Sequence, residues 1–265
     1  MANTDDLAQQ YADSQKLAAR ARLNRDYVIS HVPWFVWVAQ QLGLEGGETV
    51  LDVGCGPAWF WAEAAKALPP GLELTLTDAS PGMVEEAVQR CKGLPFTSVA
   101  GQTVKAPELP FPDSSFDKVT AMHMLYHVPD PATAIAEMFR VLKPGGWLAV
   151  TTNDTGNKRE LFELSVALGG KAEDPAAILF GYDTARRLMQ PQFGNVALRR
   201  YPARMRVTNP DDIYLALTSY PPGDRATDAQ LTAFRDNIAR AFRSGGGALE
   251  VRIETGLFLS RKPRQ

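Results

Sequence analysis

The chain has 265 residues, of which 45% are hydrophobic, and it carries 28 Lys and Arg against 30 Asp and Glu. Length and apolar content of this order suffice to bury one sizeable core, so we expect a single domain. The net charge of −2 comes without a run of like charges long enough to follow a phosphate backbone, which argues against a nucleic-acid partner.

The N-terminal segment is polar and acidic where a signal peptide would be basic and then apolar. No apolar stretch approaches membrane-spanning length, so we expect a soluble, cytoplasmic protein with no membrane partner. Cys55 and Cys91 are too few for a disulfide framework, and neither has the spacing or the nearby histidine of a zinc site. We therefore expect structural thiols and no metal.

From Glu48 to Asn153, short β-branched apolar runs alternate with longer helical patterns, which is typical of a parallel sheet covered on both faces. The clearest helix can be capped by Asp130, begins at Pro131 and is stopped by Pro144-Gly145-Gly146. We predict strands at 49–54, 73–78, 96–101, 116–123 and 147–153. We predict helices near 57–68, 80–91 and 131–142.

Beyond residue 153 the pattern predicts two closing strands with helical insertions. The helical segments lie near 157–168, 182–190, 210–219 and 227–243, and the strand-like runs at 196–207 and 249–261. The fold class is then α/β, a doubly wound, mostly parallel seven-stranded sheet with helical lid insertions. We expect residues 1–45 to form an N-terminal helical cap, 46–153 the ligand-binding core, and 154–265 the lid helices and closing strands.

The first strand runs into Gly54-Cys55-Gly56, at the turn where open parallel sheets bind ligands. The two glycines permit a tight bend with close backbone approach, and amides at the next helix start can meet a carboxylate. A dinucleotide fingerprint needs a third glycine at Trp59, and a P-loop needs a lysine that is absent. An adenosine-containing ligand without a pyrophosphate remains, although a purely structural turn fits the same residues.

Asp78 ends the second strand, where a carboxylate can accept both hydroxyls of a ribose. The alternative is an N-cap before the helix that Ser80 and Pro81 open. Because Ser80 can cap that helix itself, we favour the ribose role for Asp78.

Four segments carry motifs in a specific order: Val50–Pro57, Leu109–Val119, Leu125–Pro131 and Val141–Gly146. Together they resemble the class I S-adenosylmethionine-dependent methyltransferases, especially the small-molecule group of methyltransferase type 11. The resemblance implies a Rossmann-like methyltransferase fold, S-adenosylmethionine as methyl donor, S-adenosylhomocysteine as product and a small-molecule acceptor. It does not cover the outer segments of the chain.

The resemblance implies that Gly54 and Gly56 pass under the methionine part of the cofactor, whose amino group Asp52 faces. Asp78 would bind the ribose and Met83 would pack on adenine, although ordinary helix packing explains Met83 equally well. The full set of predicted cofactor-binding residues is Tyr11, Asp52, Gly54, Cys55, Gly56, Asp78, Ala79, Met83, Gln102, Thr103 and His123.

Two positions depart from the family pattern. Gln102 stands where the family commonly has an aspartate that accepts from the adenine amino group. Its amide oxygen accepts without charge, which implies weaker adenine binding. Ala58 stands where the family often has glycine, and we expect little effect from a residue this small.

His123 and His127 lie on the segment that leaves the fourth strand, beside the expected position of the donor methyl group. A neutral histidine can remove a proton from an acceptor oxygen or nitrogen, so both are candidate catalytic residues. For His127 we favour a bracing role in the loop, and for His123 base and bystander roles stay equal. For His31 a solvated loop position is favoured over a place at the site.

Aromatic and basic residues near the N-terminal end are further candidates. A predicted N-terminal helix carries Tyr11, Arg20 and Arg22, and one of these side chains can close over the cofactor. A solvated helix face explains the arginines as well. Four tryptophans are candidate walls of an apolar acceptor pocket, of which we expect one or two to be so and the others to be core: Trp34, Trp37, Trp59 and Trp61.

We therefore predict methyl transfer from S-adenosylmethionine to a small, apolar or aromatic metabolite. The reaction is a direct displacement at the sulfonium methyl, with donor and acceptor held in line. One alternative is a catalytically silent cofactor-binding or regulatory protein on the same fold. The other is a methyltransferase acting on protein or nucleic acid. The segment His123-Met124-Leu125-Tyr126 argues against many of these enzymes, because it lacks the Asn/Asp-Pro-Pro-aromatic pattern of families that act on exocyclic amines. A monomer and a homodimer fit equally.

Overall fold

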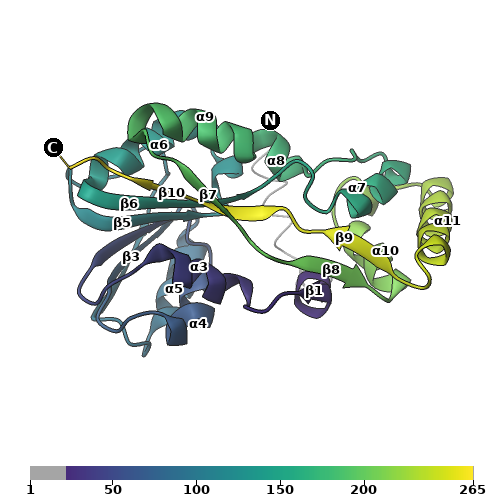
Figure 1. Cartoon of the computed structure of the whole chain (residues 1–265), viewed down its shortest axis with the longest axis horizontal. Helices are drawn as coiled ribbons and strands as arrows, with labels where there is room; N and C mark the ends of the chain where they lie inside the picture. The colour runs from purple at the N-terminus through teal and green to yellow at the C-terminus, as the bar shows by residue number, and fades with distance from the viewer. Residues whose placement is uncertain (1–21, 265) are drawn as a thin grey trace. The chain divides into compact units, whose positions relative to one another are not determined.

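A computed structural model describes residues 22–264, which divide into two compact units (Figure 1). The large unit comprises residues 32–154, 179–201 and 255–264, and the small unit comprises residues 22–31, 155–178 and 202–254. Each unit has its own sheet. In the described part of the chain, no helix combines the length and the apolar character that a bilayer crossing requires.

The large unit is built on a seven-stranded sheet. In spatial order its strands are β4 (Ser98–Thr103), β3 (Glu73–Asp78), β2 (Thr49–Val53), β5 (Phe116–Met122), β6 (Leu142–Asn153), β10 (Thr255–Arg261) and β7 (Ala197–Arg200). The first five are parallel, whereas β10 runs antiparallel to both β6 and β7. The prediction of a doubly wound, mostly parallel seven-stranded sheet is confirmed.

Helices cover both faces of this sheet. Figure 1 shows α6 (Pro131–Val141) and α9 (Tyr182–Phe193) on one face, and α3 (Trp34–Leu42), α4 (Trp59–Ala64) and α5 (Pro81–Cys91) on the other. Alternate residues of β2 face opposite ways, as a strand requires. Leu51 and Val53 join the core under α6 and α9, whereas Asp52 contacts Trp61 of α4.

Local sequence explains the best-predicted helix, α6. The Asp130 carboxylate accepts from the backbone N–H of Thr133 at 3.0 Å, and Pro131 occupies the first helical position. The helix ends at Val141, and β6 begins at once with Leu142, so Pro144-Gly145-Gly146 lies inside a strand and not in a connection. Short 3-10 helices complete the chain: η1 (Ala65–Ala67), η2 (Leu125–His127), η3 (Val166–Leu168) and η4 (Gly223–Arg225).

The small unit has a three-stranded antiparallel sheet in the order β1 (Val28–Ile29), β8 (Arg204–Val207), β9 (Leu249–Arg252). Its helices are α7 (Arg159–Ser165), α10 (Pro210–Leu217) and α11 (Asp228–Ser244), which begins with a capping box between Thr227 and Gln230. They share an apolar core that includes Met205, Phe234 and Val251. The short helix α8 (Pro175–Phe180) runs from this unit into the large one.

Two predicted strands are wrong in their extent. The run 196–207 is divided into β7 and β8, and the run 249–261 into β9 and β10, with one half of each in either sheet. Pro202 has no N–H with which to continue a ladder. At the second break, the backbone N–H of Glu254 donates to the Asn157 side chain at 3.0 Å instead of to a strand.

The predicted functional division of the chain stays a prediction. Residues 22–27 and α3 are helical, in keeping with a helical segment before residue 45, while residues 1–21 lie outside the described part. The lid role of the segments after residue 154 also stays a prediction.

Candidate active site

Three predicted ligand-binding segments follow neighbouring parallel strands. β2 pairs in parallel with β3 on one side and with β5 on the other, so the strand order reverses beside β2. Ligands of open α/β sheets bind beyond the carboxyl ends of strands at such a reversal. The turn after β2, Asp78 at the end of β3 and His123 after β5 all lie at this edge.

The turn after β2 needs its two glycines. Gly54 has φ 68° and Gly56 has φ 51°, both in the left-handed region that glycine adopts without steric cost. A Cβ on Gly54 would lie 2.8 Å from the Met124 side chain, whereas a Cβ on Gly56 would meet nothing within 4 Å. The backbone N–H of Cys55 donates to the Thr77 carbonyl at 2.8 Å, which anchors the turn to β3.

Two further residues of this turn, Ala58 and Cys55, are affected by strain and by burial. Ala58 is fully buried with φ 57°, so a side chain sits in a conformation that costs a non-glycine residue roughly 1 kcal/mol. The expectation of little effect at Ala58 ignored this strain. Burial raises the pKa of the Cys55 thiol, which keeps it protonated, and the binding role of Cys55 stays a prediction.

Trp59 stands at the third-glycine position of a dinucleotide fingerprint, so that glycine is absent here. Trp59 begins α4 with its side chain outward, is 44% exposed, and lies 5.9 Å from the Arg90 guanidinium. The buried residue at this helix start is Ala58, so in this protein the start of α4 meets the sheet through Ala58 and not through Trp59. Arg90 also donates to the Pro57 carbonyl, which ties the turn to α5.

Asp78 joins the turn to the end of β3. One carboxylate oxygen accepts from the N–H of Gly56 at 3.0 Å and the other from the N–H of Ser80 at 2.9 Å. Ser80 occupies the N-cap position of α5 but makes no side-chain capping bond, so the expectation that it caps this helix is wrong. Asp78 is half-buried and Ala79 exposed, and both keep their binding roles as predictions.

Asp52 lies beneath the turn and is only 2% exposed. Its carboxylate accepts from Trp61 Nε1 at 2.8 Å and from Thr120 Oγ1 at 2.6 Å. Burial raises the pKa of Asp52 to about 6, against the lowering effect of these two bonds. Trp61 is thus a core residue and not a pocket wall, and the predicted role of Asp52 toward the cofactor amino group stays a prediction.

The raised pKa makes stability depend on pH at Asp52. The folded protein holds this proton more tightly than the unfolded chain, so the group lowers the free energy of unfolding as pH rises from about 4 to 6, by up to about 3 kcal/mol. We expect Asp52→Asn to gain stability relative to wild type across this range. Urea unfolding at pH 4.5 and pH 7 measures the difference in free energy of unfolding between Asp52→Asn and the wild type, with the exposed Asp113→Asn as control. If this difference were the same at both pH values, the burial argument would be contradicted.

The predicted adenine-side residues lie at the same edge. In the parallel pairing of β3 with β4, Thr103 lies opposite Asp78 and Gln102 opposite Thr77. Gln102 and Thr103 are exposed, and Met83 is half-buried on α5. The structure therefore brings these residues to the edge that carries Asp78, although their contacts with a cofactor stay predictions.

His123 follows β5 in a strained conformation. Its φ is 51°, and its backbone N–H lies 3.2 Å from the Thr151 carbonyl and 2.9 Å from Thr151 Oγ1. Histidine is one of the few non-glycine residues enriched in this region. The ring lies 5.7 Å from that of Trp34, and its Nε2 is 3.4 Å from Thr255 Oγ1.

The other two histidines differ from His123. His127 lies in η2 and is exposed, and its ring lies 4.5 Å from that of Tyr126 at an interplanar angle of 60°. The protein around its ring lowers the pKa of His127 despite the opposing charge of Asp78, which favours the neutral form. His31 is an exposed residue of the small unit. The bracing role and the catalytic role of His127 both stay predictions.

An aromatic cluster formed by Trp34, Trp37 and Tyr201 adjoins His123. Trp34 stacks on Trp37 at 5.5 Å, and Tyr201 meets Trp34 edge-on at 5.1 Å. The Tyr201 hydroxyl donates to the Val32 carbonyl at 2.7 Å, which fixes the cluster to the start of α3. Sequence reasoning missed Tyr201 and Thr255, because both are distant in the chain and no local motif marks them.

Of the three candidates on the predicted N-terminal helix, the structure describes Arg22. Tyr11 and Arg20 lie outside the described residues. Arg22 forms an ion pair with Asp212 at 3.0 Å within the small unit, which favours the structural alternative for this arginine.

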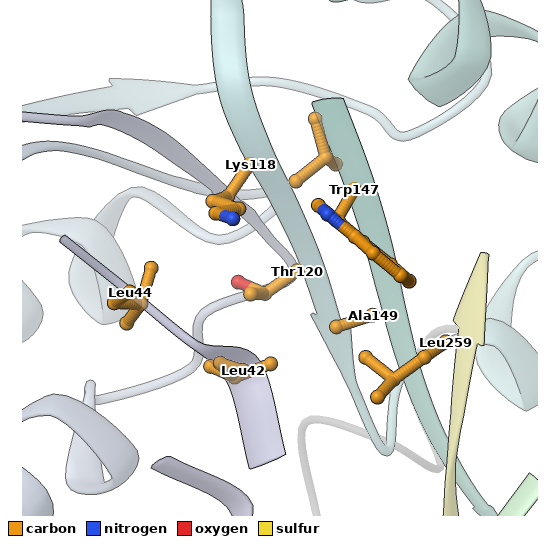
Figure 2. Close-up of a pocket in the computed structure, with 8 residues that line it drawn as sticks. Leu42, Leu44, Lys118, Thr120, Trp147, Ala149 and Leu259 are labelled. Atoms are coloured by element: carbon orange, nitrogen blue, oxygen red, sulfur yellow. The ribbon is translucent and has the colours of Figure 1, made fainter. Parts of the chain in front are cut away.

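A depression on the sheet face is not a ligand site. Figure 2 shows its lining, with Thr120 on β5, Trp147 on β6 and Leu259 on β10 around it. The space is too small to hold a water molecule. Among residues 22–264, no group of three or more His, Cys, Asp or Glu side chains is arranged to hold a metal ion.

Comparisons with known proteins agree with this geometry. Residues 51–150 match the family described as a methyltransferase domain. A demethylmenaquinone methyltransferase of Listeria welshimeri is 39% identical over 119 residues, which are 45% of this chain and 50% of that protein. The chain thus spans about half the length of this relative.

Solved structures share the fold at low identity. The cyclase SpnF has a TM-score of 0.55 at 23% identity, covering 87% of this chain and 80% of its own. Phosphoethanolamine N-methyltransferase 2 of Haemonchus contortus, solved with S-adenosylhomocysteine, has a TM-score of 0.56 at 18% identity over 97% of this chain and 59% of its own. The matched segment shows that residues 51–150 carry a methyltransferase domain, and the solved structures share the Rossmann-like methyltransferase fold of the seven-stranded sheet.

Proposed function

We propose that the protein transfers a methyl group from S-adenosylmethionine to a small, apolar or aromatic acceptor. The observation that carries this proposal is the meeting of the glycine turn, Asp78 and His123 at the carboxyl edge of three adjacent strands. The family match supplies the donor, and the aromatic cluster beside His123 supports an acceptor with apolar surface.

The residues of the turn fit such a cofactor. Gly56 faces open space where any side chain would project, so a ligand can approach its backbone closely. Asp78 offers carboxylate oxygens of the kind that a ribose diol requires. The bound cofactor supplies an electrophilic methyl group, and we infer that the chain's own residues mainly orient the acceptor and exclude water.

The nature of the acceptor rests on residues outside the matched segment. The relatives in Listeria carry demethylmenaquinone in their name, but the match to them covers less than half of this chain. Trp34, Tyr201 and Thr255 all lie outside residues 51–150. We therefore propose an apolar or aromatic acceptor from the cluster itself, and we propose that the helical segments after residue 154 act as its lid.

Two alternatives follow from the same fold. A catalytically silent cofactor-binding or regulatory protein keeps the turn and Asp78 without transferring a methyl group. A solved structure of this fold carries the name of a cyclase, so the fold alone does not decide the reaction. A protein or nucleic-acid acceptor is the second alternative. We also propose a cytoplasmic location and an assembly that is either a monomer or a homodimer.

Calorimetry with two cofactors tests the donor. We expect S-adenosylmethionine and S-adenosylhomocysteine to bind with micromolar affinity, because the glycine turn lets a ligand approach its backbone and Asp78 can accept from the ribose hydroxyls. NAD is the control and should give no heat, because the third glycine of a dinucleotide fingerprint is absent at Trp59. A turnover screen with labelled donor then separates a methyltransferase from a silent binder. Micromolar NAD binding without a response to S-adenosylhomocysteine would overturn the proposal.

A further inference from the structure

We propose that β4 and α5 form an interface through which two copies of this chain pair about a two-fold axis. In this dimer the two β4 strands run antiparallel and join the seven-stranded sheets of both copies, and the two α5 helices lie side by side. The proposal goes beyond the proposed function, since it concerns assembly and does not depend on methyl transfer.

β4 is an edge strand that lacks the usual protection against pairing. It stands at one end of the seven-stranded sheet, and β3 is its one partner among the described strands. An edge strand directs a row of backbone N–H and C=O groups outward, and proteins commonly protect such rows with charged side chains, proline or short length. The six residues of β4, Ser-Val-Ala-Gly-Gln-Thr, include neither a charge nor a proline. The strand is therefore suited to accept another strand.

The other edges of the two sheets are protected. β7, at the far end of the large sheet, carries Arg199 and Arg200, and both are exposed. In the small unit, β9 carries Glu250 and Arg252, and β1 has 2 residues. Of the edge strands that the structure describes, β4 is the one that combines length with neutrality.

α5 covers one face of β4 and turns one of its flanks toward the free edge. Gly101 faces this helix, since a Cβ on it would lie 2.6 Å from Val88 Cγ2 and 2.7 Å from Val84 Cγ1. Val84 is buried, whereas Val88 is half-buried. On the opposite flank of the helix, Arg90 donates to the Pro57 carbonyl in the turn after β2. The flank that carries Val88 therefore points away from β2 and toward the free edge of the sheet.

A stripe of three residues on this flank is complementary to itself. Glu85, Val88 and Lys92 follow at intervals of three and four residues, so they line one side of the helix. Glu85 and Lys92 are exposed. Along the helix axis, Glu85 lies about 4.5 Å before Val88 and Lys92 about 6 Å after it. When a second copy runs the opposite way with Val88 opposite Val88, each Glu85 carboxylate therefore meets the partner's Lys92.

The strand and the helix agree on the position of the axis. Residues directly opposite one another in an antiparallel pair direct their side chains to the same face. An axis through Gly101 places this residue opposite its own copy, next to Val88. α5 contacts both β3 and β4. Because strands lie about 4.8 Å apart, two helices that each lie over the last two strands of their sheet come to about 10 Å, which is the distance at which helices pack.

Charge exchange across the axis tests the proposal. Sedimentation of the full chain over a dilution series should show a wild-type dimer and gives its dissociation constant. Glu85→Lys and Lys92→Glu each place like charges opposite one another twice, and each should raise that constant roughly tenfold or more. The double variant exchanges the two charges, so it should return the constant to within about threefold of the wild-type value.

Two further measurements separate this interface from others. Glu63→Lys makes the same change of charge at an exposed residue of α4 and should leave the dissociation constant unchanged. Amide hydrogen exchange in residues 98–103 should slow as the protein concentration rises, because the outward N–H groups of β4 become hydrogen-bonded. Thermal unfolding checks that each variant folds.

Three results would contradict the dimer. A wild type that stays monomeric throughout the series would overturn the proposal and leave the edge of β4 for a strand of another protein. A dimer that is insensitive to both single charge reversals would overturn it as well. A dimer without protection of the β4 amides would assign the contact to a different surface.

Discussion

Replacing Asp78 by alanine is expected to weaken the binding of S-adenosylhomocysteine by roughly 100-fold or more. A hydrogen bond to a charged acceptor contributes roughly 1.5–3 kcal/mol, and the ribose role predicts two of them. Each 1.4 kcal/mol is about tenfold in affinity. The carboxylate also accepts from Gly56 and Ser80, so its loss releases the turn as well. Calorimetric titration measures the dissociation constant.

An analogue separates the two contributions. A cofactor analogue without the ribose hydroxyls should bind the wild type more weakly than S-adenosylhomocysteine does. Asp78→Ala should bind the analogue and S-adenosylhomocysteine with nearly equal affinity, because the pair of carboxylate and hydroxyls is already broken in this variant. Asp78→Asn keeps one acceptor oxygen, so its affinity for S-adenosylhomocysteine should lie between those of the wild type and Asp78→Ala. Thermal unfolding checks that the variants fold, and exposed Asp113→Ala is the matched control. An unchanged dissociation constant would reduce Asp78 to a structural brace of the turn.

The part of the fold that the sequence predicts well is the part held by local signals. β2, β3 and β5 begin and end within a few residues of the predicted ranges, because each is a short apolar run between turn residues. The glycines of the turn and Asp78 follow from the same strands. Parallel pairing then brings their carboxyl ends to one edge without further information.

The part that the sequence does not predict depends on pairing between distant segments. The runs that contain β7 with β8 and β9 with β10 keep strand-like residues throughout, so periodicity gives no sign that each half joins a different sheet. Thr255 reaches His123, and Tyr201 reaches Trp34 beside it, only because β10 and the end of β7 close the large sheet. The missed site residues therefore lie where the missed topology lies.

Backbone conformation explains the remaining errors. Whether Ala58 and His123 adopt a positive φ cannot be read from composition, since neither is glycine. The outward side chain of Trp59 follows from the helix beginning there, after the left-handed residue. Strained residues of this kind gather at functional sites, which supports the choice of His123 as the residue to test.

Replacing His123 by alanine is expected to lower turnover roughly 100-fold, with the affinity for S-adenosylhomocysteine nearly unchanged. The reason is that a positioned base contributes roughly 100-fold or more to a proton transfer, while its loss leaves the turn and Asp78 in place. Steady-state kinetics with labelled donor gives kcat and KM, and calorimetry gives the cofactor affinity.

Alanine alone is an ambiguous probe, because His123 has φ 51° and alanine tolerates that conformation poorly. Asparagine resolves the ambiguity, since it enters the left-handed region readily and has no basic nitrogen. If His123 acts as the base, His123→Asn should keep the wild-type free energy of unfolding and still lose turnover as His123→Ala does. A rise confined to the acceptor KM would assign His123 to the pocket wall. Near-normal turnover in both variants would leave orientation by the aromatic cluster and the glycine turn to account for the reaction.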